Sequence, residues 1–128
     1  MPGLAYSVTF DASPHPIHWV GSSLEDLRSF PDPVQDVMGY ALYLAQCGER
    51  HGAAKPLRGF LRGLTEVRDS YQGNAYRVVY TAKLSGVIYV LHAFQKRATR
   101  GTATPRHHLE LIRKRYRLAQ EHHSGARQ

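Results

Sequence analysis

Arginine, lysine and histidine recur within residues 64–100 at spacings that could gather them on one face of a sheet. This stretch clusters β-branched and aromatic residues and breaks at two turn signals, which predicts three sequential antiparallel strands over 65–71, 74–81 and 87–94. A two-residue Gln72-Gly73 turn would place Arg68 directly opposite Arg77. Because adjacent like charges on a sheet repel each other, such a face is easiest to explain if it holds an anion between them.

The third strand decides which other groups join this face. A four-residue turn at 83–86 would pair Arg77 with His92, and a two-residue turn would pair it with Phe94; both registers keep the same alternation of side chains. The face would then carry Arg68, Arg77, His92, Phe94 and Lys96. A three- or five-residue turn without a bulge would reverse the third strand and separate these groups.

Groups of these types can cleave RNA without a cofactor. The ribose 2′-OH attacks the adjacent phosphate, cations stabilise the charge that gathers on the phosphoryl oxygens, and a proton leaves one oxygen and reaches another. His92, with an ordinary histidine pKa of about 6.5, is one candidate base, and a lysine with a lowered pKa is a rival. The alternative interpretation is structural: the arginines are solvated and His92, inside an apolar run, belongs to the core.

A metal or other cofactor is not expected. Few carboxylates fall in the predicted strands, and the adjacent pairs His107-His108 and His122-His123 diverge on a helix. The single cysteine, Cys47, excludes a disulfide framework and a zinc site built on cysteines.

Charge is unevenly distributed along the chain, whose net charge is +7. Residues 1–54 carry two bases and six acids, whereas residues 55–128 carry fifteen bases and four acids. This asymmetry favours a polyanionic partner, most often nucleic acid. The residues that we expect to contact RNA around the predicted face are Lys55, Arg58, Arg62, Phe94, Arg100, Arg106, Arg113 and Lys114.

The remaining elements must hold this face in place. A short strand is expected over 17–20, followed by two helices: one begins with a Ser22–Glu25 capping box, and the other runs from Asp32 to about residue 47. We expect this helical hairpin to pack its apolar stripe on the opposite face of the sheet. Residues 48–63 are predicted to form a loop. A last helix begins at Thr104-Pro105; its buried stripe is predicted to hold Leu109, Ile112, Tyr116 and Ala119, and its exposed faces Arg106, Arg113, Lys114, Arg115 and Arg117.

The fold class is therefore α+β: a small, mainly antiparallel sheet between an amino-terminal helical hairpin and a basic carboxy-terminal helix. Its 128 residues predict one domain over 1–128, with 1–15 as an extension containing a strand-like piece at 5–10, and 122–128 as a disordered tail. No apolar run approaches the roughly 20 residues of a membrane span, and the amino terminus lacks a signal pattern. We expect a cytoplasmic protein with no membrane partner.

Several segments resemble a known family. YRVVY at 76–80, YVLHAFQK at 89–96 and KPLRG at 55–59, followed by a basic helix capped by Thr-Pro, look like the RelE/ParE toxin superfamily, specifically its HigB-like, phage-derived branch. The resemblance covers about residues 17–121. It implies the toxin of a type II toxin–antitoxin system, which cleaves messenger RNA on the ribosome as an endoribonuclease. It also implies a toxin that is monomeric alone and is neutralised by a helix-turn-helix antitoxin.

The resemblance also implies roles for individual residues. Arg77 would bind the scissile phosphate, Lys96 or Arg97 would stabilise charge or protonate the leaving 5′ oxygen, and Arg68 would position the substrate. Glu66 stands where ribosome-dependent members carry a cation, and their carboxy-terminal tyrosine has no match here. A second interpretation is therefore a non-catalytic binder on the same scaffold, such as a gyrase-inhibiting toxin or a degenerate phage-derived protein that binds nucleic acid or an antitoxin.

Overall fold

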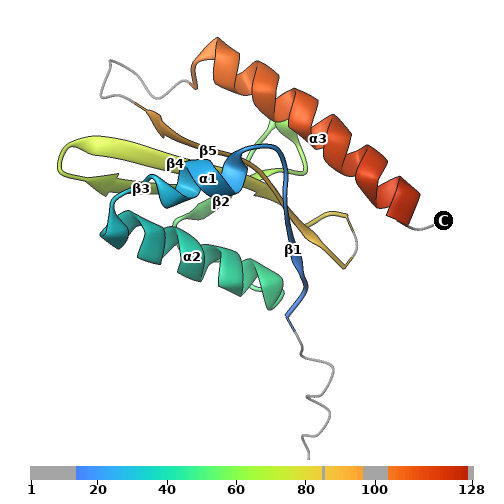
Figure 1. The fold of residues 1–128 in the computed structure, drawn as a ribbon, viewed down its shortest axis with the longest axis horizontal. Helices are drawn as coiled ribbons and strands as arrows, with labels where there is room; N and C mark the ends of the chain where they lie inside the picture. The colour runs from blue at the N-terminus through green and yellow to red at the C-terminus, as the bar shows by residue number, and fades with distance from the viewer. Residues whose placement is uncertain (1–13, 85, 97–103, 127–128) are drawn as a thin grey trace, which may run out of the picture.

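A five-stranded sheet lies between helices on its two faces (Figure 1). The computed structural model describes residues 14–84, 86–96 and 104–126. The elements are β1 (Ile17–Trp19), α1 (Ser23–Arg28), α2 (Asp32–Gln46), β2 (Ala54–Pro56), the 3₁₀ helix η2 (Gly59–Leu61), β3 (Thr65–Tyr71), β4 (Asn74–Thr81), β5 (Ile88–Lys96) and α3 (Arg106–Ala126). The strand order is β1-β5-β4-β3-β2, in which β1 is parallel to β5 and the other pairs are antiparallel.

The turn between β3 and β4 sets the register of the central hairpin. Gln72 and Gly73 both have positive φ, 49° and 80°, as a two-residue hairpin turn of type I′ requires. Tyr71 consequently pairs with Asn74, and Arg68 lies opposite Arg77. The register predicted from this dipeptide is confirmed.

A β-bulge sets the register of β4 against β5. Val79 pairs with His92 whereas the next residue, Tyr80, pairs with Val90, so Leu91 is the extra residue on β5. Arg77 therefore lies opposite Phe94. This is one of the two predicted pairings, although the bulge and a connection between Thr81 and Ile88, not a two-residue turn, produce it.

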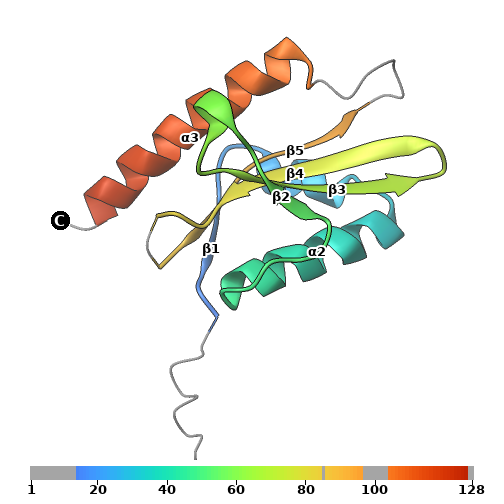
Figure 2. The same cartoon turned by 180° about the vertical axis from the view of Figure 1, so that it is seen from behind.

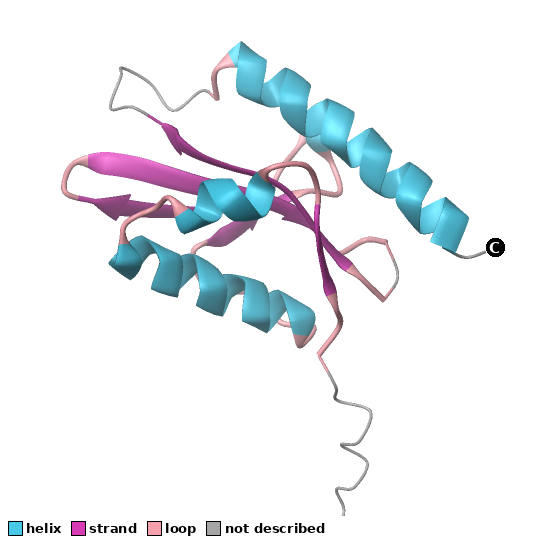
Figure 3. Cartoon of the chain, viewed as in Figure 1, coloured by secondary structure: helices cyan, strands magenta, loops and turns pink. Residues whose placement is uncertain are grey.

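One face of the sheet packs on α2 (Figures 1 and 3). The apolar side chains of α2 recur at helical spacing and meet the inward-facing valines of β3, β4 and β5. Residues fully buried in this core include Val34, Met38, Ala41, Val67, Val78 and Val90. The predicted helical hairpin and its position over this face are confirmed.

The other face packs on α3, which is seen from behind in Figure 2. Ile112 and Ala119 of α3 are buried against Val79, Tyr89 and Leu91 of the sheet. The predicted stripe is confirmed at these two helix positions, and Leu109 and Tyr116 are partly buried against the same cluster. The α+β arrangement expected from the sequence is thus the observed one, and no helix in the described ranges could cross a membrane.

Several local expectations were wrong. The Ser22 hydroxyl donates to a carboxylate oxygen of Asp26 at 2.8 Å and caps no backbone N–H, so the predicted capping box with Glu25 does not form. The predicted loop at 48–63 contains the edge strand β2, which pairs with β3, and also η2. The last strand continues to Lys96, two residues beyond its expected end.

The predicted disordered tail is helical as far as Ala126. The Tyr89 hydroxyl and Nδ1 of His122 are 2.8 Å apart, and the His122 ring stacks on His18 of β1 at 4.1 Å between centroids. These contacts fasten the last turns of α3 to the sheet. The strand-like piece expected at 5–10 lies outside the described residues.

Candidate functional site

The polar residues of the candidate site occupy three adjacent rows on the α3 side of the sheet. In the middle row, Arg68, Arg77 and Phe94 lie side by side on β3, β4 and β5. A second row runs through Lys55, Glu66, Val79 and His92, and a third ends at Lys96, which pairs with Ala75. The sheet register therefore places Arg68, Arg77, His92, Phe94 and Lys96 on one face, as their spacing predicts.

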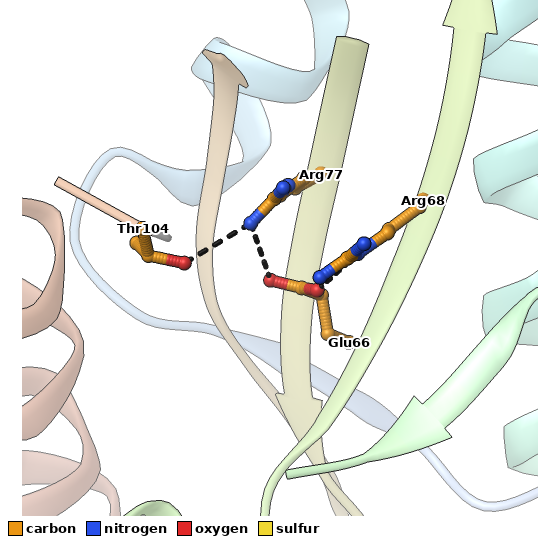
Figure 4. A network of polar contacts seen from close by, with 4 residues as sticks. All are labelled: Glu66, Arg68, Arg77 and Thr104. Atoms are coloured by element: carbon orange, nitrogen blue, oxygen red, sulfur yellow. Dashed lines mark hydrogen bonds and ion pairs between the residues drawn. The ribbon is translucent and has the colours of Figure 1, made fainter. Parts of the chain in front are cut away.

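Glu66 supplies an anion between the two arginines (Figure 4). Its Oε1 accepts a hydrogen bond from Nε of Arg68 at 2.7 Å, and its Oε2 lies 3.5 Å from Nη1 of Arg77. Glu66 and Arg77 are each only 4% exposed, whereas the side chain of Arg68 is 53% exposed. The like charges that suggested a bound anion are thus bridged by a carboxylate of the chain itself.

Arg77 lies beneath the start of α3. Its Nη1 donates to the hydroxyl of Thr104 at 3.0 Å, and Thr104 lies two residues before the first residue of the helix, Arg106 (Figure 4). Burial lowers the pKa of Arg77 and the charge of Arg68 lowers it further, while Glu66 acts in the opposite direction. An arginine nevertheless stays charged at neutral pH, so Arg77 is a buried cation held between two oxygen-bearing side chains.

Lys96 is the second buried cation of the site, at 5% exposure. It occupies a position diagonal to Arg77 across the β4–β5 pair, where side chains are separated by roughly 7–8 Å. Burial lowers the pKa of Lys96, and the charges of Arg77 and Arg68 lower it further. A lysine in such surroundings gives up its proton more readily than a solvated one.

His92 belongs to a buried network. Nη1 of Arg115 lies 3.3 Å from its Nδ1, and its Nε2 lies 2.8 Å from Nδ1 of His108. Arginine can only donate, so Nδ1 of His92 accepts and Nε2 carries the proton that is donated to His108. Burial lowers the pKa of His92 to about 4, and His108 and Arg115 contribute in the same direction. The lone pair of Nδ1, which would have to take up a proton from a substrate, is therefore engaged by Arg115. This disfavours the expected role of His92 as a base.

Arg115 is the residue that the sequence interpretation placed wrongly. It was expected on an exposed face of α3, but it is buried and donates to the carbonyl oxygen of Leu91 and to the hydroxyl of Ser22, both at 3.0 Å. Gly21, at φ +58°, passes so close that a Cβ there would lie 2.8 Å from Nε of Arg115. The spacing along α3 could have indicated this burial. Residue 115 is three positions after Ile112 and four before Ala119, so it lies on the same buried stripe of the helix.

Phe94 also differs from its expected role. It is 5% exposed and stacks on the ring of His108 at 4.2 Å and on that of His92 at 4.8 Å between centroids. As folded, its ring is covered by the first turn of α3 and is closed to a nucleobase.

The other expected RNA contacts are spread more widely. Lys55 is exposed on the same face, in the row of Glu66. Arg106, Arg113 and Lys114 are exposed on α3, and Arg58 and Arg62 are exposed directly before and directly after η2. Arg97 and Arg100 lie outside the described residues. Arg62 also lines a cavity of about 660 Å³ at the far end of the sheet, together with Arg50 and Lys83.

Comparison with known proteins identifies the family. The family model described as "Phage derived protein Gp49-like (DUF891)" matches residues 25–117, most of the chain. The chain belongs to this Gp49-like family. The predicted relation to the RelE/ParE toxin superfamily and its phage-derived branch is thereby confirmed, and this Gp49-like protein is a RelE-type toxin.

Among solved structures, the Gp49-like chain is similar to a chain in the RelBE2 toxin–antitoxin complex from Mycobacterium tuberculosis. The identity is 19%, the TM-score is 0.48, and the alignment covers 66% of this chain and 100% of the other. A comparison with curated proteins found no match. The family assignment therefore rests on the Gp49-like match.

Proposed function

We propose that this Gp49-like protein is an endoribonuclease that cleaves messenger RNA on the ribosome and thereby inhibits translation. The observation that supports the proposal best is the gathering of Arg68, Arg77 and Lys96 on one face of the sheet. Together with Lys55 they surround a single carboxylate, that of Glu66, so the site keeps an excess of positive charge. Such a site suits a phosphodiester whose negative charge increases in the transition state.

The two arginines have different roles in this proposal. Arg68 uses its Nε–H on Glu66, and because its side chain is half exposed, its terminal N–H groups remain accessible to a substrate phosphate. Arg77 would exchange its hydrogen bond to Thr104 for one to a phosphoryl oxygen and stabilise the charge that develops there. Glu66 is a positioning residue that fixes both guanidinium groups.

Lys96 is the proposed group for proton transfer. Its lowered pKa increases the fraction of neutral amine that can take the proton from the 2′ oxygen. The 2′ oxygen then bonds to phosphorus, and the bond from phosphorus to the 5′ oxygen breaks. The 5′ oxygen takes a proton from water, and Lys96 returns to water the proton that it took up. His92 does not contact the substrate in this scheme; with Arg115 and His108 it holds α3 beside the site. No metal is needed for these steps, and none of the described side chains form a group of three or more metal-binding residues.

A second candidate is a binder without catalytic activity, and the placement of Glu66 favours it. A carboxylate at 2.7 Å from Arg68 and 3.5 Å from Arg77 competes with a substrate phosphate for the same donors. Under this alternative the basic surface would bind gyrase, nucleic acid or an antitoxin.

The partners follow from the same proposal. We propose a cytoplasmic toxin, monomeric alone, that binds the ribosome and messenger RNA and is neutralised by a cognate helix-turn-helix antitoxin. The solved relative was determined as a toxin–antitoxin complex. An acidic partner surface would match the strongly basic segment after residue 54.

Induced expression in bacteria, with mapping of messenger RNA ends, tests the proposal. Arg77→Lys keeps the charge but loses the forked guanidinium, so we expect cleavage to fall roughly 100-fold while ribosome binding is largely retained. Arg28→Lys, on an exposed residue of α1, is the matched control and should cleave normally. Full cleavage by Arg77→Lys would remove Arg77 from the mechanism. A wild-type protein that binds ribosomes but never cuts would favour the binder, and double-strand breaks in DNA would indicate a gyrase poison.

A further inference from the structure

Phe60 is the most exposed of the large apolar side chains in the described part of the chain, at 66%. It lies in η2, on the loop that connects β2 to β3. The guanidinium carbon of Arg113, on α3, lies 5.0 Å from the centroid of its ring, within cation–π distance. A ring this exposed gains little from folding, because most of its apolar surface stays in water.

The backbone holds Phe60 firmly. Within the short helix the N–H of Leu61 donates to the carbonyl of Arg58, and the N–H of Arg62 donates to that of Gly59. The side chain of Leu61 is buried in the core on the α3 side of the sheet. The N–H of Leu57 donates to the carbonyl of Leu64 and closes the base of the loop. The ring of Phe60 therefore faces solvent from a turn whose backbone is fixed by hydrogen bonds and by the buried side chain of Leu61.

Basic residues connect this ring with the candidate site. Arg106, Glu110, Arg113 and Arg117 recur at helical spacing and therefore share one exposed face of α3. The face begins beside Thr104, which bonds to Arg77, and reaches Arg113 about 10 Å farther along the helix. Glu110 offsets Arg106 only weakly, since their 3.8 Å ion pair is solvent-exposed. Arg58 and Arg62 are exposed on the two sides of Phe60 in the sequence.

We propose that Phe60 and Arg113 form a binding site for one unpaired nucleobase of a single-stranded RNA that crosses the arginine face of α3 on its way to the candidate site. A flat aromatic ring next to cations is the arrangement that single strands use, with bases stacked on the ring and phosphates near the arginines. The base stacks on Phe60, and Arg113 pairs with the neighbouring phosphate. This site extends the proposed nuclease function and rests on it only for the identity of the substrate.

The test is direct binding of an RNA that cannot be cut. A labelled single strand of about 12 nucleotides carries 2′-O-methyl groups, which block the attacking oxygen, and its affinity is measured by fluorescence anisotropy. We expect Phe60→Ala to weaken binding by roughly tenfold and Phe60→Trp to preserve it. Phe60→Ala should leave the affinity for inorganic polyphosphate, which has no bases, unchanged. Arg113→Ala should reduce the slope of log affinity against log salt by about one.

Tyr40→Ala is the matched control, because Tyr40 is 56% exposed on α2, on the opposite side of the sheet. It should bind RNA as the wild type does. The proposed site is overturned if Phe60→Ala keeps full RNA affinity, if it weakens polyphosphate binding equally, or if the wild type does not bind the RNA. Failure of this site can be told apart from failure of the proposed nuclease. If the wild type cuts on the ribosome and Phe60→Ala keeps its RNA affinity, only the stacking site is refuted. If Phe60→Ala binds RNA more weakly and the wild type does not cut, only the nuclease is refuted.

Discussion

The two faces of the sheet are built from different kinds of residue. On the α2 side, Val67, Val78 and Val90 pack on Val34 and Met38 with no exposed surface. On the α3 side the apolar cluster is interrupted by buried ionisable groups, namely Glu66, Arg77, His92, Lys96 and Arg115. Burying charge costs free energy unless each group is paired and hydrogen-bonded. The α2 face therefore supplies stability, while the α3 face retains costly groups that form the candidate site.

The largest expected effect is on the apolar face. Met38 is fully buried, and Met38→Ala should lower the free energy of unfolding by about 2–5 kcal/mol, through lost transfer energy and the cavity left behind. Urea unfolding measures the change. Tyr43→Ala, on an exposed residue of the same helix, should cost far less. Equal losses in the two variants would contradict the assignment of stability to this face.

Glu66→Gln tests the charged face. The substitution removes the carboxylate charge from beside the buried guanidinium of Arg77. We therefore expect a loss of about 3 kcal/mol, the low end for a broken buried pair because Arg68, the other partner of Glu66, reaches solvent. RNA affinity should rise at the same time, since one negative charge leaves the site. Unfolding and anisotropy titrations on the same variant separate the two effects. A variant that is destabilised and also binds RNA more weakly would argue against competition between Glu66 and a phosphate.

The smallest expected effect is a pH dependence of the free energy of unfolding, which we expect from the buried histidine of the α3 face. The pKa of His92 is lowered from 6.5 to about 4, so between these values the unfolded chain binds a proton that the folded chain does not. The contribution of neutral His92 to the free energy of unfolding is therefore fully present above pH 6.5. It is lost as the pH decreases toward 4, which lowers the free energy of unfolding by at most about 3 kcal/mol. His18 and His108, whose pKa values are also lowered by burial, act in the same direction.

Urea unfolding of the wild type and of His92→Gln, at neutral pH and at about pH 4.5, measures this dependence. The variant should show a flatter profile. His15→Gln, on an exposed residue outside the sheet, should leave the profile unchanged. A wild type equally stable at both pH values would mean that folding does not lower the pKa of His92, and would contradict the role of its Nδ1 as an acceptor for Arg115.

Local signals predicted the sheet well. The Gln72-Gly73 turn determines the register of β3 against β4. The alternation of side chains along these strands then places Arg68 and Arg77 on the same face. The apolar period of α2 similarly predicts which helix face is buried. These features depend on residues close together in the chain, so they can be read without knowledge of the fold.

Features that depend on distant partners were not predictable in this way. β2 has only three residues and is defined by its pairing with β3. Arg115 bonds to Ser22, which is 93 positions away, and the burial of one arginine within a run of basic residues follows from that contact. His122 is held by Tyr89, 33 positions earlier, so composition alone suggested disorder where a helix continues. Glu66 was noticed as a departure from the family pattern, but its bridge between two arginines required the neighbouring strand.

The bulge on β5 has a consequence at the level of the gene. Deleting the single codon for Leu91 would leave Val90 and His92 adjacent, and both could keep their present pairs on β4 and their present faces of the sheet. The ladder would become regular, but α3 would lose the carbonyl to which Arg115 donates. One inserted residue therefore acts as an attachment point for a helix of 21 residues without changing the pattern of the strand around it.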